Sequence, residues 1–299
     1  MATTEPADPT PYTAPAPKNT WVGAVDTAWI ISTGNELLIG RIANTNAQWL
    51  AERLTLYGFR VERIVTVPDE PEEEAQAFRE ALRARVVVST GGLGPTFDDK
   101  TAEAVAAAYG RPLVLNEEAL RMVREKYEAA GMGLTPERVK MAYLPLGSRP
   151  LYNPVGTAPG IYLEVRGTHV FVLPGPPREM KGMFTESVEP LLRRVAPKIY
   201  WCEAGFTMKG VAEADFAPHV KRAMRLSRRV YVKSHPRGRE TGLSVVELHI
   251  TASGPDPEEL RVEVGRVLEA LLEAARGAGG AVEKVWGPVV RRPWGGAQA

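Results

Sequence analysis

Short apolar runs alternate with amphipathic segments through the first two-thirds of the chain. Apolar runs of strand length occur at 28–33, 61–67, 86–90, 161–165 and 170–173. Apolar residues at helical spacing occur at 47–54, 71–83, 101–109 and 117–130. Because parallel strands need a crossover connection between them, this recurring order predicts a three-layer α/β domain with helices on both faces of a parallel sheet.

The pattern changes near residue 197, where the order becomes β-α-β-β-α-β. Strands are expected at 200–207, 230–233, 244–251 and 282–286, and helices at 212–226 and 257–276. This order is typical of a small ferredoxin-like α+β domain. The sequence therefore predicts two domains, at 23–197 and 198–299. They follow a flexible tail at 1–22, which is rich in proline and poor in large apolar residues.

Composition and charge narrow the class of protein. The chain has 37 Lys and Arg against 36 Asp and Glu, a net charge of +1, which argues against a nucleic-acid partner. No apolar stretch reaches the roughly 18 residues of a membrane span, and the N-terminus lacks the apolar core of a signal peptide. The single Cys202 cannot form an internal disulfide, which fits a reducing compartment. We therefore expect a cytoplasmic protein with no membrane partner.

The strongest candidate for chemistry is the segment Thr90-Gly91-Gly92-Leu93-Gly94-Pro95-Thr96-Phe97-Asp98-Asp99-Lys100-Thr101. It joins the carboxyl end of an expected parallel strand, where open α/β sheets bind ligands, to a helix. Its glycines allow backbone N–H groups to approach an anion. A bridging Mg²⁺ would reconcile Asp98 and Asp99 with a phosphate, since carboxylates alone repel phosphate. The structural alternative is that one Asp caps the helix and the glycines only turn the chain.

Three further segments have the composition of loops at the same edge of the sheet. They are Gly34–Gly40, which precedes the candidate helix caps Asn44 and Asn46; Asn153–Gly160; and Leu173–Met180. The last of these repeats the strand-to-helix arrangement of the glycine-rich segment, so it is a second candidate anion site. Taken alone, the segment Gly34–Gly40 is adequately explained as a turn followed by a helix cap.

Together, the four loops resemble those of the molybdopterin-binding (MoaB/Mog-like) superfamily, and specifically its competence/damage-inducible CinA-like branch. The resemblance extends from about Ala28 to Arg194, with four distinctive loops in the family's order. It implies a nucleotide-like or pterin-like small-molecule ligand. CinA-type domains are associated with metal-dependent cleavage of ADP-ribose to AMP and ribose 5-phosphate, whereas the related cofactor-synthesis branch handles adenylylated molybdopterin.

The resemblance also implies roles for particular residues. It makes Glu36, Asp98 and Asp99 candidate ligands of a divalent metal, with the two aspartates as catalytic residues. It assigns Gly91, Gly92, Gly94 and Thr96 to a phosphate loop, Asn153, Gly156 and Thr157 to a loop that closes over the substrate, and Gly175 and Pro176 to a second anion site.

The function that this resemblance favours is a metal-dependent pyrophosphohydrolase of ADP-ribose or a related nucleoside diphosphate compound. Two alternatives stay open: an enzyme of molybdenum-cofactor synthesis, which transfers an adenylyl group or inserts the metal, and a binding module without catalysis. The resemblance also implies a homo-oligomer. CinA-like proteins often carry a further domain that deamidates nicotinamide mononucleotide. Since the chain ends shortly after the ferredoxin-like segment, we expect no such activity.

Overall fold

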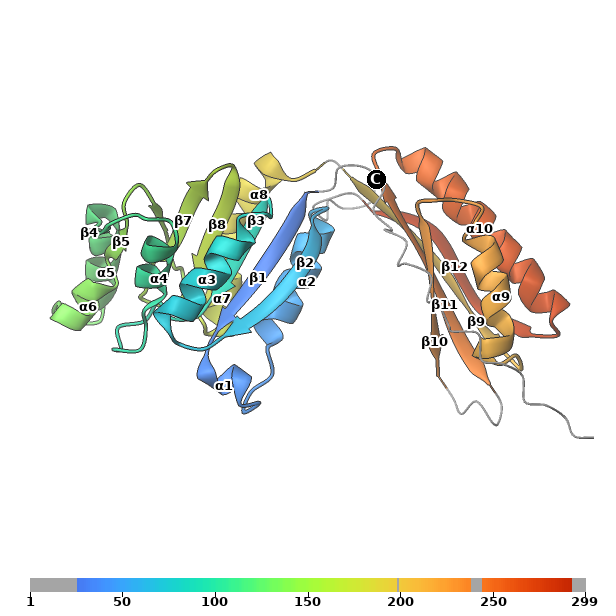
Figure 1. The fold of residues 1–299 in the computed structure, drawn as a ribbon, viewed down its shortest axis with the longest axis horizontal. Helices are drawn as coiled ribbons and strands as arrows, with labels where there is room; N and C mark the ends of the chain where they lie inside the picture. Colours follow the sequence, from blue (N-terminus) through green and yellow to red (C-terminus); the bar gives the residue numbers. More distant parts are fainter. Residues whose placement is uncertain (1–25, 198, 238–243, 292–299) are drawn as a thin grey trace, which may run out of the picture. The chain divides into compact units, whose positions relative to one another are not determined.

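The structure is a computed structural model that describes residues 26–197, 199–237 and 244–291. The chain divides into two compact units, with the boundary between Tyr200 and Trp201 (Figure 1). The tail expected at 1–22 lies outside the described residues. Within the described part of the chain, no helix combines the length and the apolar character needed to cross a membrane.

The N-terminal unit alternates strands and helices, and every element predicted for it is present at nearly the predicted position. Its strands are β1 (Thr27–Thr33), β2 (Arg60–Val67), β3 (Val86–Thr90), β4 (Leu113–Leu115), β5 (Tyr143–Pro145), β6 (Arg149–Leu151), β7 (Gly160–Val165) and β8 (Thr168–Leu173). Its helices are α1 (Asn35–Leu38), α2 (Thr45–Leu56), α3 (Pro71–Ala81), α4 (Thr101–Ala108), α5 (Glu117–Ala129), α6 (Pro136–Lys140), α7 (Pro177–Met183) and α8 (Glu189–Val195), with a π-helical turn at Phe184–Val188.

The main sheet has the strand order β2-β1-β3-β8-β7-β6. Its first four strands are parallel, as predicted. The last two are antiparallel to their neighbours, so the sheet is mixed rather than wholly parallel. The reversal between β7 and β8 occurs at Arg166 and Gly167, whose φ angles of 51° and 85° are both left-handed. Two successive left-handed residues are typical of a tight hairpin turn, which joins antiparallel strands.

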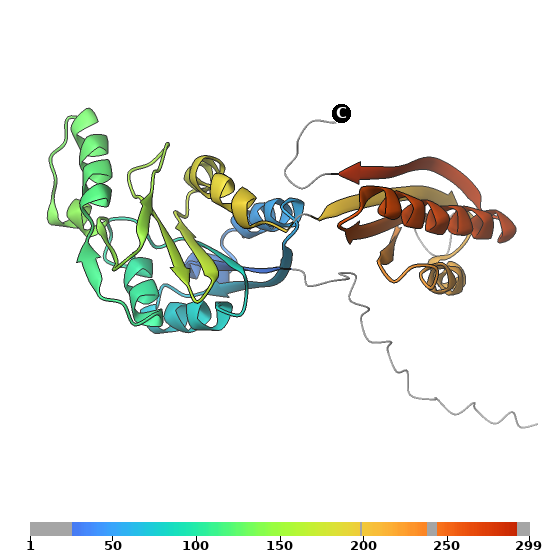
Figure 2. The same ribbon diagram turned by 90° about the horizontal axis from the view of Figure 1, so that it is seen from above.

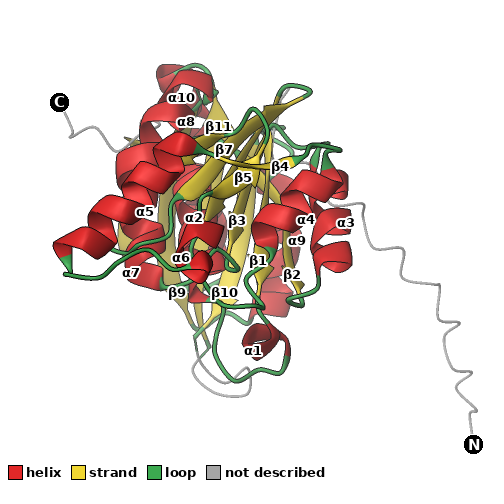
Figure 3. Cartoon of the chain, turned by 90° about the vertical axis from the view of Figure 1, so that its left-hand side faces the viewer, coloured by secondary structure: helices red, strands yellow, loops and turns green. Residues whose placement is uncertain are grey.

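Helices cover both faces of this sheet because successive side chains of a strand point to opposite faces. Trp29 and Ile31 of β1 belong to the core formed with α3, α4 and α5. Ala28 and Ile30 belong to the opposite core, formed with α2, α7 and α8. In Figure 2, α3 and α4 lie on one side of the sheet and α7 and α8 on the other, and Figure 3 shows the central strands between the helices. The three-layer arrangement predicted from the sequence is confirmed.

The parallel pairing aligns the carboxyl ends of three neighbouring strands. Ser32 in β1 pairs with Thr90 at the end of β3, and Thr90 pairs with Leu173 at the end of β8. The loops that follow β1, β3 and β8 therefore leave the sheet at the same edge. Three of the four loops singled out in the sequence begin there.

The C-terminal unit has the predicted ferredoxin-like order of elements. These are β9 (Tyr200–Lys209), α9 (Glu213–Ala223), β10 (Val230–Pro236), β11 (Val245–Gly254), α10 (Pro257–Gly277) and β12 (Ala281–Arg291). Its four strands pair in the order β10-β11-β9-β12, and Figure 1 shows α9 and α10 on the same face of that sheet. Alternate side chains of β11 are buried, as expected for a sheet with one covered face.

Candidate functional site

A cavity of about 420 Å³ lies where the loops after β1, β3 and β8 come together. We refer to it as the strand-end cavity. The predicted site residues that line it are Glu36, Gly91, Gly92, Gly94, Thr96, Asp98, Asp99, Thr157, Gly175 and Pro176. Asn153 and Gly156 are not among its lining residues. The structure therefore brings most of the residues named from the sequence to one place, although they come from four separate loops.

The glycine-rich loop approaches its surroundings too closely for side chains. Gly91 and Gly92 have φ angles of 110° and 66°, in the left-handed region that favours glycine. A Cβ atom on Gly91 would lie 2.4 Å from the carbonyl oxygen of Thr33, and one on Gly92 would lie 2.0 Å from Thr101 Oγ1. The backbone N–H groups of Gly92, Leu93 and Gly94 find no acceptor among the described residues. The loop thus offers free donors for an anion, next to the start of α4.

The two aspartates of this loop converge on one hydroxyl group. Thr96 Oγ1 lies within hydrogen-bonding distance of both Asp98 Oδ1 and Asp99 Oδ2, and the backbone N–H of Thr96 donates to Asp99 Oδ2 at 2.9 Å. The hydrogen bond from Thr96 lowers the pKa of Asp98 below its ordinary value. Since one hydroxyl proton cannot serve both carboxylates, the pair has unused negative charge that suits a cation.

The strand-end cavity is strongly acidic. Its acidic lining residues are Glu36, Asp69, Asp98, Asp99 and Glu179, and none of the described residues that line it is Lys, Arg or His. No group of three or more Asp, Glu, His or Cys side chains in the described part of the chain is close enough to hold a metal ion. Glu36 lies on the short helix α1, and its carboxylate lies beside the backbone of Gly34. The structure therefore pairs Asp98 with Asp99 but does not assemble a three-carboxylate cluster with Glu36.

Asn153 shapes a loop rather than lining the cavity. Its Nδ2 donates to the carbonyl of Ala158 at 3.0 Å and to Glu179 Oε2 at 2.8 Å, and its Oδ1 accepts from the N–H of Gly156 at 2.8 Å. A Cβ atom on Gly156 would lie 1.9 Å from Glu179 Oε2. Both residues therefore hold the loop that brings Thr157 to the cavity.

The loop predicted as a second anion site is tied to α2 by Asn46, which was considered in the sequence only as a helix cap. Asn44 is the cap, because its side chain accepts from the N–H of Ala47 at 3.0 Å. Asn46 instead donates from Nδ2 to the carbonyl of Gly175 at 2.7 Å. A Cβ atom on Gly175 would lie 3.7 Å from the Cα of Gly91, so the two glycine-containing loops are neighbours.

Two acidic residues of the cavity were not singled out in the sequence. Asp69 follows β2 and accepts a 2.9 Å hydrogen bond from the backbone N–H of Asn35, and Glu179 lies on the first turn of α7. Asp69 could have been found from the sequence, because it lies two residues after a predicted parallel strand. For Glu179, the sequence offered no indication beyond its place in the proline-rich loop.

A fully buried carboxyl group lies behind the glycine-rich loop. Glu74 of α3 has no exposed surface, and its carboxyl group faces the hydroxyls of Thr33 and Thr101, which are also buried. None of these side-chain oxygens forms a well-aligned hydrogen bond with another described residue. Burial raises the pKa of Glu74 from 4.5 to about 7. No feature of the sequence distinguishes Glu74 from the exposed residues Glu72 and Glu73 beside it.

Comparisons with known proteins place this site in context. Residues 29–194 match the family model described as "probable molybdopterin binding domain". A protein from Pyrobaculum aerophilum is 54% identical over 247 residues, which are 82% of this chain and 93% of that protein. A protein from Aeropyrum pernix is 52% identical over 258 residues, 86% of this chain and 96% of the relative. The crystal structure of the protein CinA from Thermoplasma acidophilum, whose function is given as unknown, is 46% identical. It covers 56% of this chain and 98% of that chain, with a TM-score of 0.53.

Proposed function

The chain belongs to the probable molybdopterin binding domain family, and we propose that its N-terminal unit is a metal-dependent pyrophosphohydrolase of ADP-ribose or a related nucleoside diphosphate compound. Family membership supports a nucleotide-like or pterin-like ligand. The similarity to a CinA protein and the chemistry of the strand-end cavity support the choice of a nucleoside diphosphate.

The charge of the cavity is the observation that carries this proposal. The free N–H groups of the glycine-rich loop attract an anion, yet five acidic side chains line the same cavity. A diphosphate would be repelled by these carboxylates unless a cation lay between them. Mg²⁺ is typically held by one or two carboxylates together with substrate phosphates. The pair Asp98 and Asp99 fits this mode of binding, and a cluster of three carboxylates is not required for it.

In the proposed reaction a water molecule attacks one phosphorus atom of ADP-ribose. The P–O bond to the bridging oxygen breaks, and AMP and ribose 5-phosphate are the products. The N–H groups of Gly92, Leu93 and Gly94 bind phosphoryl oxygens as negative charge accumulates on them. Thr96 orients the carboxylates of Asp98 and Asp99. A divalent ion, when bound, would supply Lewis-acid polarisation of a phosphoryl oxygen and a water of lowered pKa.

The test is ³¹P NMR of ADP-ribose incubated with the purified protein, with and without Mg²⁺ or Mn²⁺. We expect metal-dependent appearance of AMP and ribose 5-phosphate, and loss of both products in Asp98→Asn and Asp99→Asn. The matched control is Asp215→Asn, because Asp215 is an exposed residue of α9 in the other unit. No turnover by the wild-type protein with any divalent ion would reject the hydrolase.

The family description favours a second candidate, an enzyme that transfers an adenylyl group to molybdopterin or inserts the metal into it. The same glycine-rich loop would then hold the phosphate of the pterin or of ATP. This candidate predicts that ATP is consumed only when molybdopterin is present. A binding module without catalysis would instead bind its ligand tightly and turn over neither ATP nor ADP-ribose.

We also propose that the chain forms a homo-oligomer, which rests on the family resemblance alone. Sedimentation velocity of the purified protein measures this directly. A single species with the mass of one chain, 32.6 kDa, would contradict it.

A further inference from the structure

The two helices of the C-terminal unit leave a groove between them, with a volume of about 530 Å³. The end of α9 lies beside the first half of α10, because Ser227 Oγ donates to Glu263 Oε2 at 2.6 Å, so the two helices run in opposite directions (Figure 1). We refer to the space between them as the helix groove. The residues of its walls that matter below are Arg222, Leu226, Ala270, Glu273, Ala274 and Gly277.

The helix groove has a small-residue depression beside an exposed apolar side chain. Ala270, Ala274 and Gly277 follow one another at spacings of four and three residues, so they lie on one face of α10. Their small size leaves that face hollow. Leu226, which follows α9, lines the same groove and is 46% exposed. A projecting leucine and a hollow of this kind are the two halves of a close helix contact.

Charges of opposite sign lie on the two walls of the groove. Arg222 belongs to the α9 wall and Glu273 to the α10 wall, and both are exposed. Arg225 and Glu269, also exposed, repeat this arrangement one turn further along. None of the four forms an ion pair with another residue of the described chain. The groove therefore suits a partner with the same two charges in reverse order.

A second copy of the chain has this complementary pattern. A two-fold axis along the groove exchanges its two walls, so Arg222 of one copy faces Glu273 of the other, and Leu226 faces the small residues of α10. We propose that the helix groove is the interface of a homodimer, in which α9 and α10 of two copies pack face to face. This inference rests on the proposed homo-oligomer and does not depend on the ligand of the N-terminal unit.

The face around the groove is large enough for a stable dimer. The longer helix, α10, has 21 residues. Two adjacent helices of this kind present a face of roughly 30 by 20 Å, at about 1.5 Å of rise per residue and roughly 10 Å of diameter. Stable interfaces bury about 800 Å² on each partner, which a corrugated face of this size can supply.

The experiment measures the dissociation constant of the full-length protein by sedimentation velocity over a range of concentrations. Arg222→Glu and Glu273→Arg each place like charges opposite one another in the dimer. We therefore expect the dissociation constant to rise at least tenfold in either variant. Lys221→Glu is the matched control, because Lys221 is the exposed neighbour of Arg222 on α9 and does not line the groove.

Mixing the two variants tests the pairing itself. A chain with Arg222→Glu and a chain with Glu273→Arg have complementary charges at both contacts of the two-fold interface. We expect an equimolar mixture to form dimers with a dissociation constant close to that of the wild type. Mixing cannot repair a damaged fold, so this result would separate a lost contact from misfolding.

Leu226→Ser tests the apolar part of the interface. Since two copies of this side chain are buried in each dimer, we expect the dissociation constant to rise at least tenfold. Val262→Ser is the matched control, because Val262 is 58% exposed on α10 and does not line the groove.

The outcomes separate the two proposals. A wild-type protein that sediments as one chain of 32.6 kDa at every concentration would overturn the homo-oligomer and this inference together. An oligomer that Arg222→Glu, Glu273→Arg and Leu226→Ser all leave unchanged would overturn the helix groove alone, since another surface would then join the copies. A mixture of the two charge variants that stays monomeric would also overturn it.

Discussion

Asn153 and Glu179 are joined by a 2.8 Å hydrogen bond from Asn153 Nδ2 to Glu179 Oε2. Asn153 lies in the loop before β7, and Glu179 lies on α7, 26 residues later in the chain. The bond ties the loop that contains Asn153 to α7, next to the strand-end cavity. Since Asn153 is only 3% exposed and also bonds within its own loop, its amide group sets the position of that loop relative to α7.

Replacement of Asn153 by alanine should destabilise the N-terminal unit. The variant leaves the carbonyl of Ala158, the N–H of Gly156 and the carboxylate of Glu179 without their partner, so we expect the free energy of unfolding to fall by roughly 2–4 kcal/mol. Urea denaturation measures this change. A double-mutant cycle with Glu179→Ala isolates the bond between the two side chains, and we expect a coupling of about 1–3 kcal/mol. Strictly additive effects would mean that the bond contributes nothing.

Gly156→Ala should displace the same loop through a steric clash. The new Cβ atom would lie 1.9 Å from Glu179 Oε2, a distance that forces one of the two groups to move. We expect binding of ADP-ribose to weaken about tenfold in calorimetry with Mg²⁺, roughly 1.4 kcal/mol. Gly133→Ala is the matched control, because a Cβ atom there meets nothing within 4 Å and the φ angle is not left-handed. Equal affinities of the two variants would contradict this prediction.

Glu74 should make the stability of the N-terminal unit depend on pH. Burial raises its pKa from 4.5 to about 7, so the folded state favours the protonated form. The stabilising contribution is complete below pH 4.5 and is lost as the pH rises through about 7. The difference between the two pKa values corresponds to about 3 kcal/mol of folding free energy. Glu74→Gln stays neutral, so its stability should exceed that of the wild type at pH 8 and not at pH 4.5.

The measurement is urea unfolding of both proteins at several values between pH 4.5 and pH 8. Other carboxyl groups titrate in both proteins, and only the difference between the two curves reports on residue 74. Glu73→Gln is the matched control, since Glu73 is the exposed neighbour on the same helix. Parallel curves for wild type and Glu74→Gln would show that folding does not shift the pKa of this carboxyl group.

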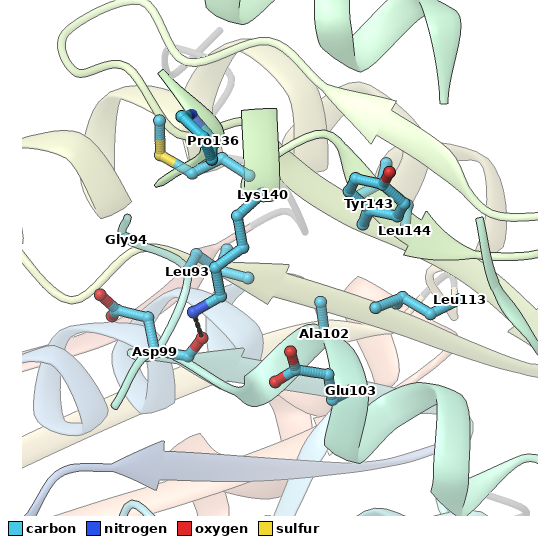
Figure 4. A pocket seen from close by; sticks show the side chains of 12 residues that line it. Leu93, Gly94, Asp99, Ala102, Glu103, Leu113, Pro136, Lys140, Tyr143 and Leu144 are labelled. Carbon is cyan, nitrogen blue, oxygen red and sulfur yellow. Dashed lines mark hydrogen bonds between the residues drawn. The ribbon is translucent and has the colours of Figure 1, made fainter. Parts of the chain in front are cut away.

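Lys140→Met should loosen the glycine-rich loop without unfolding the unit. The methionine keeps much of the side-chain volume but removes the donors to the carbonyl oxygens of Thr96 and Asp99, the second of which Figure 4 shows. Hydrogen bonds to charged groups contribute roughly 1.5–3 kcal/mol. We therefore expect the affinity for ADP-ribose with Mg²⁺ to fall at least tenfold, with the melting temperature lowered by several degrees and thermal unfolding still cooperative. Lys221→Met, on exposed α9 surface, controls for the loss of a positive charge.

The order of the main elements could be predicted from the sequence because it depends on local periodicity. The apolar run of β3 and the amphipathic α5 were recognisable without any knowledge of their neighbours. The short elements β4, α6 and β5 were not predicted, because segments of three to five residues carry too little periodicity. The antiparallel direction of β7 depends on a two-residue turn, which the strand pattern itself does not encode.

Only part of the candidate site could be predicted from the sequence. Residues in loops that follow predicted parallel strands, such as Gly91 and Asp98, were brought to one cavity as the topology requires. The roles of Asn153 and Lys140 depend on contacts with distant segments, so they became visible only in the structure. Glu74 was missed because its burial comes from the packing of α3 against α4.

The shared edge of β1, β3 and β8 also affects how a site of this kind can change its ligand during evolution. Strand pairing fixes the spacing between the backbone donors that follow these strands, and the loops carry the side chains that contact a ligand. Mutations in one loop can therefore alter which molecule is recognised while the others keep their place. Mutation and selection can therefore change which ligand the loops bind without changing the sheet that positions the loops.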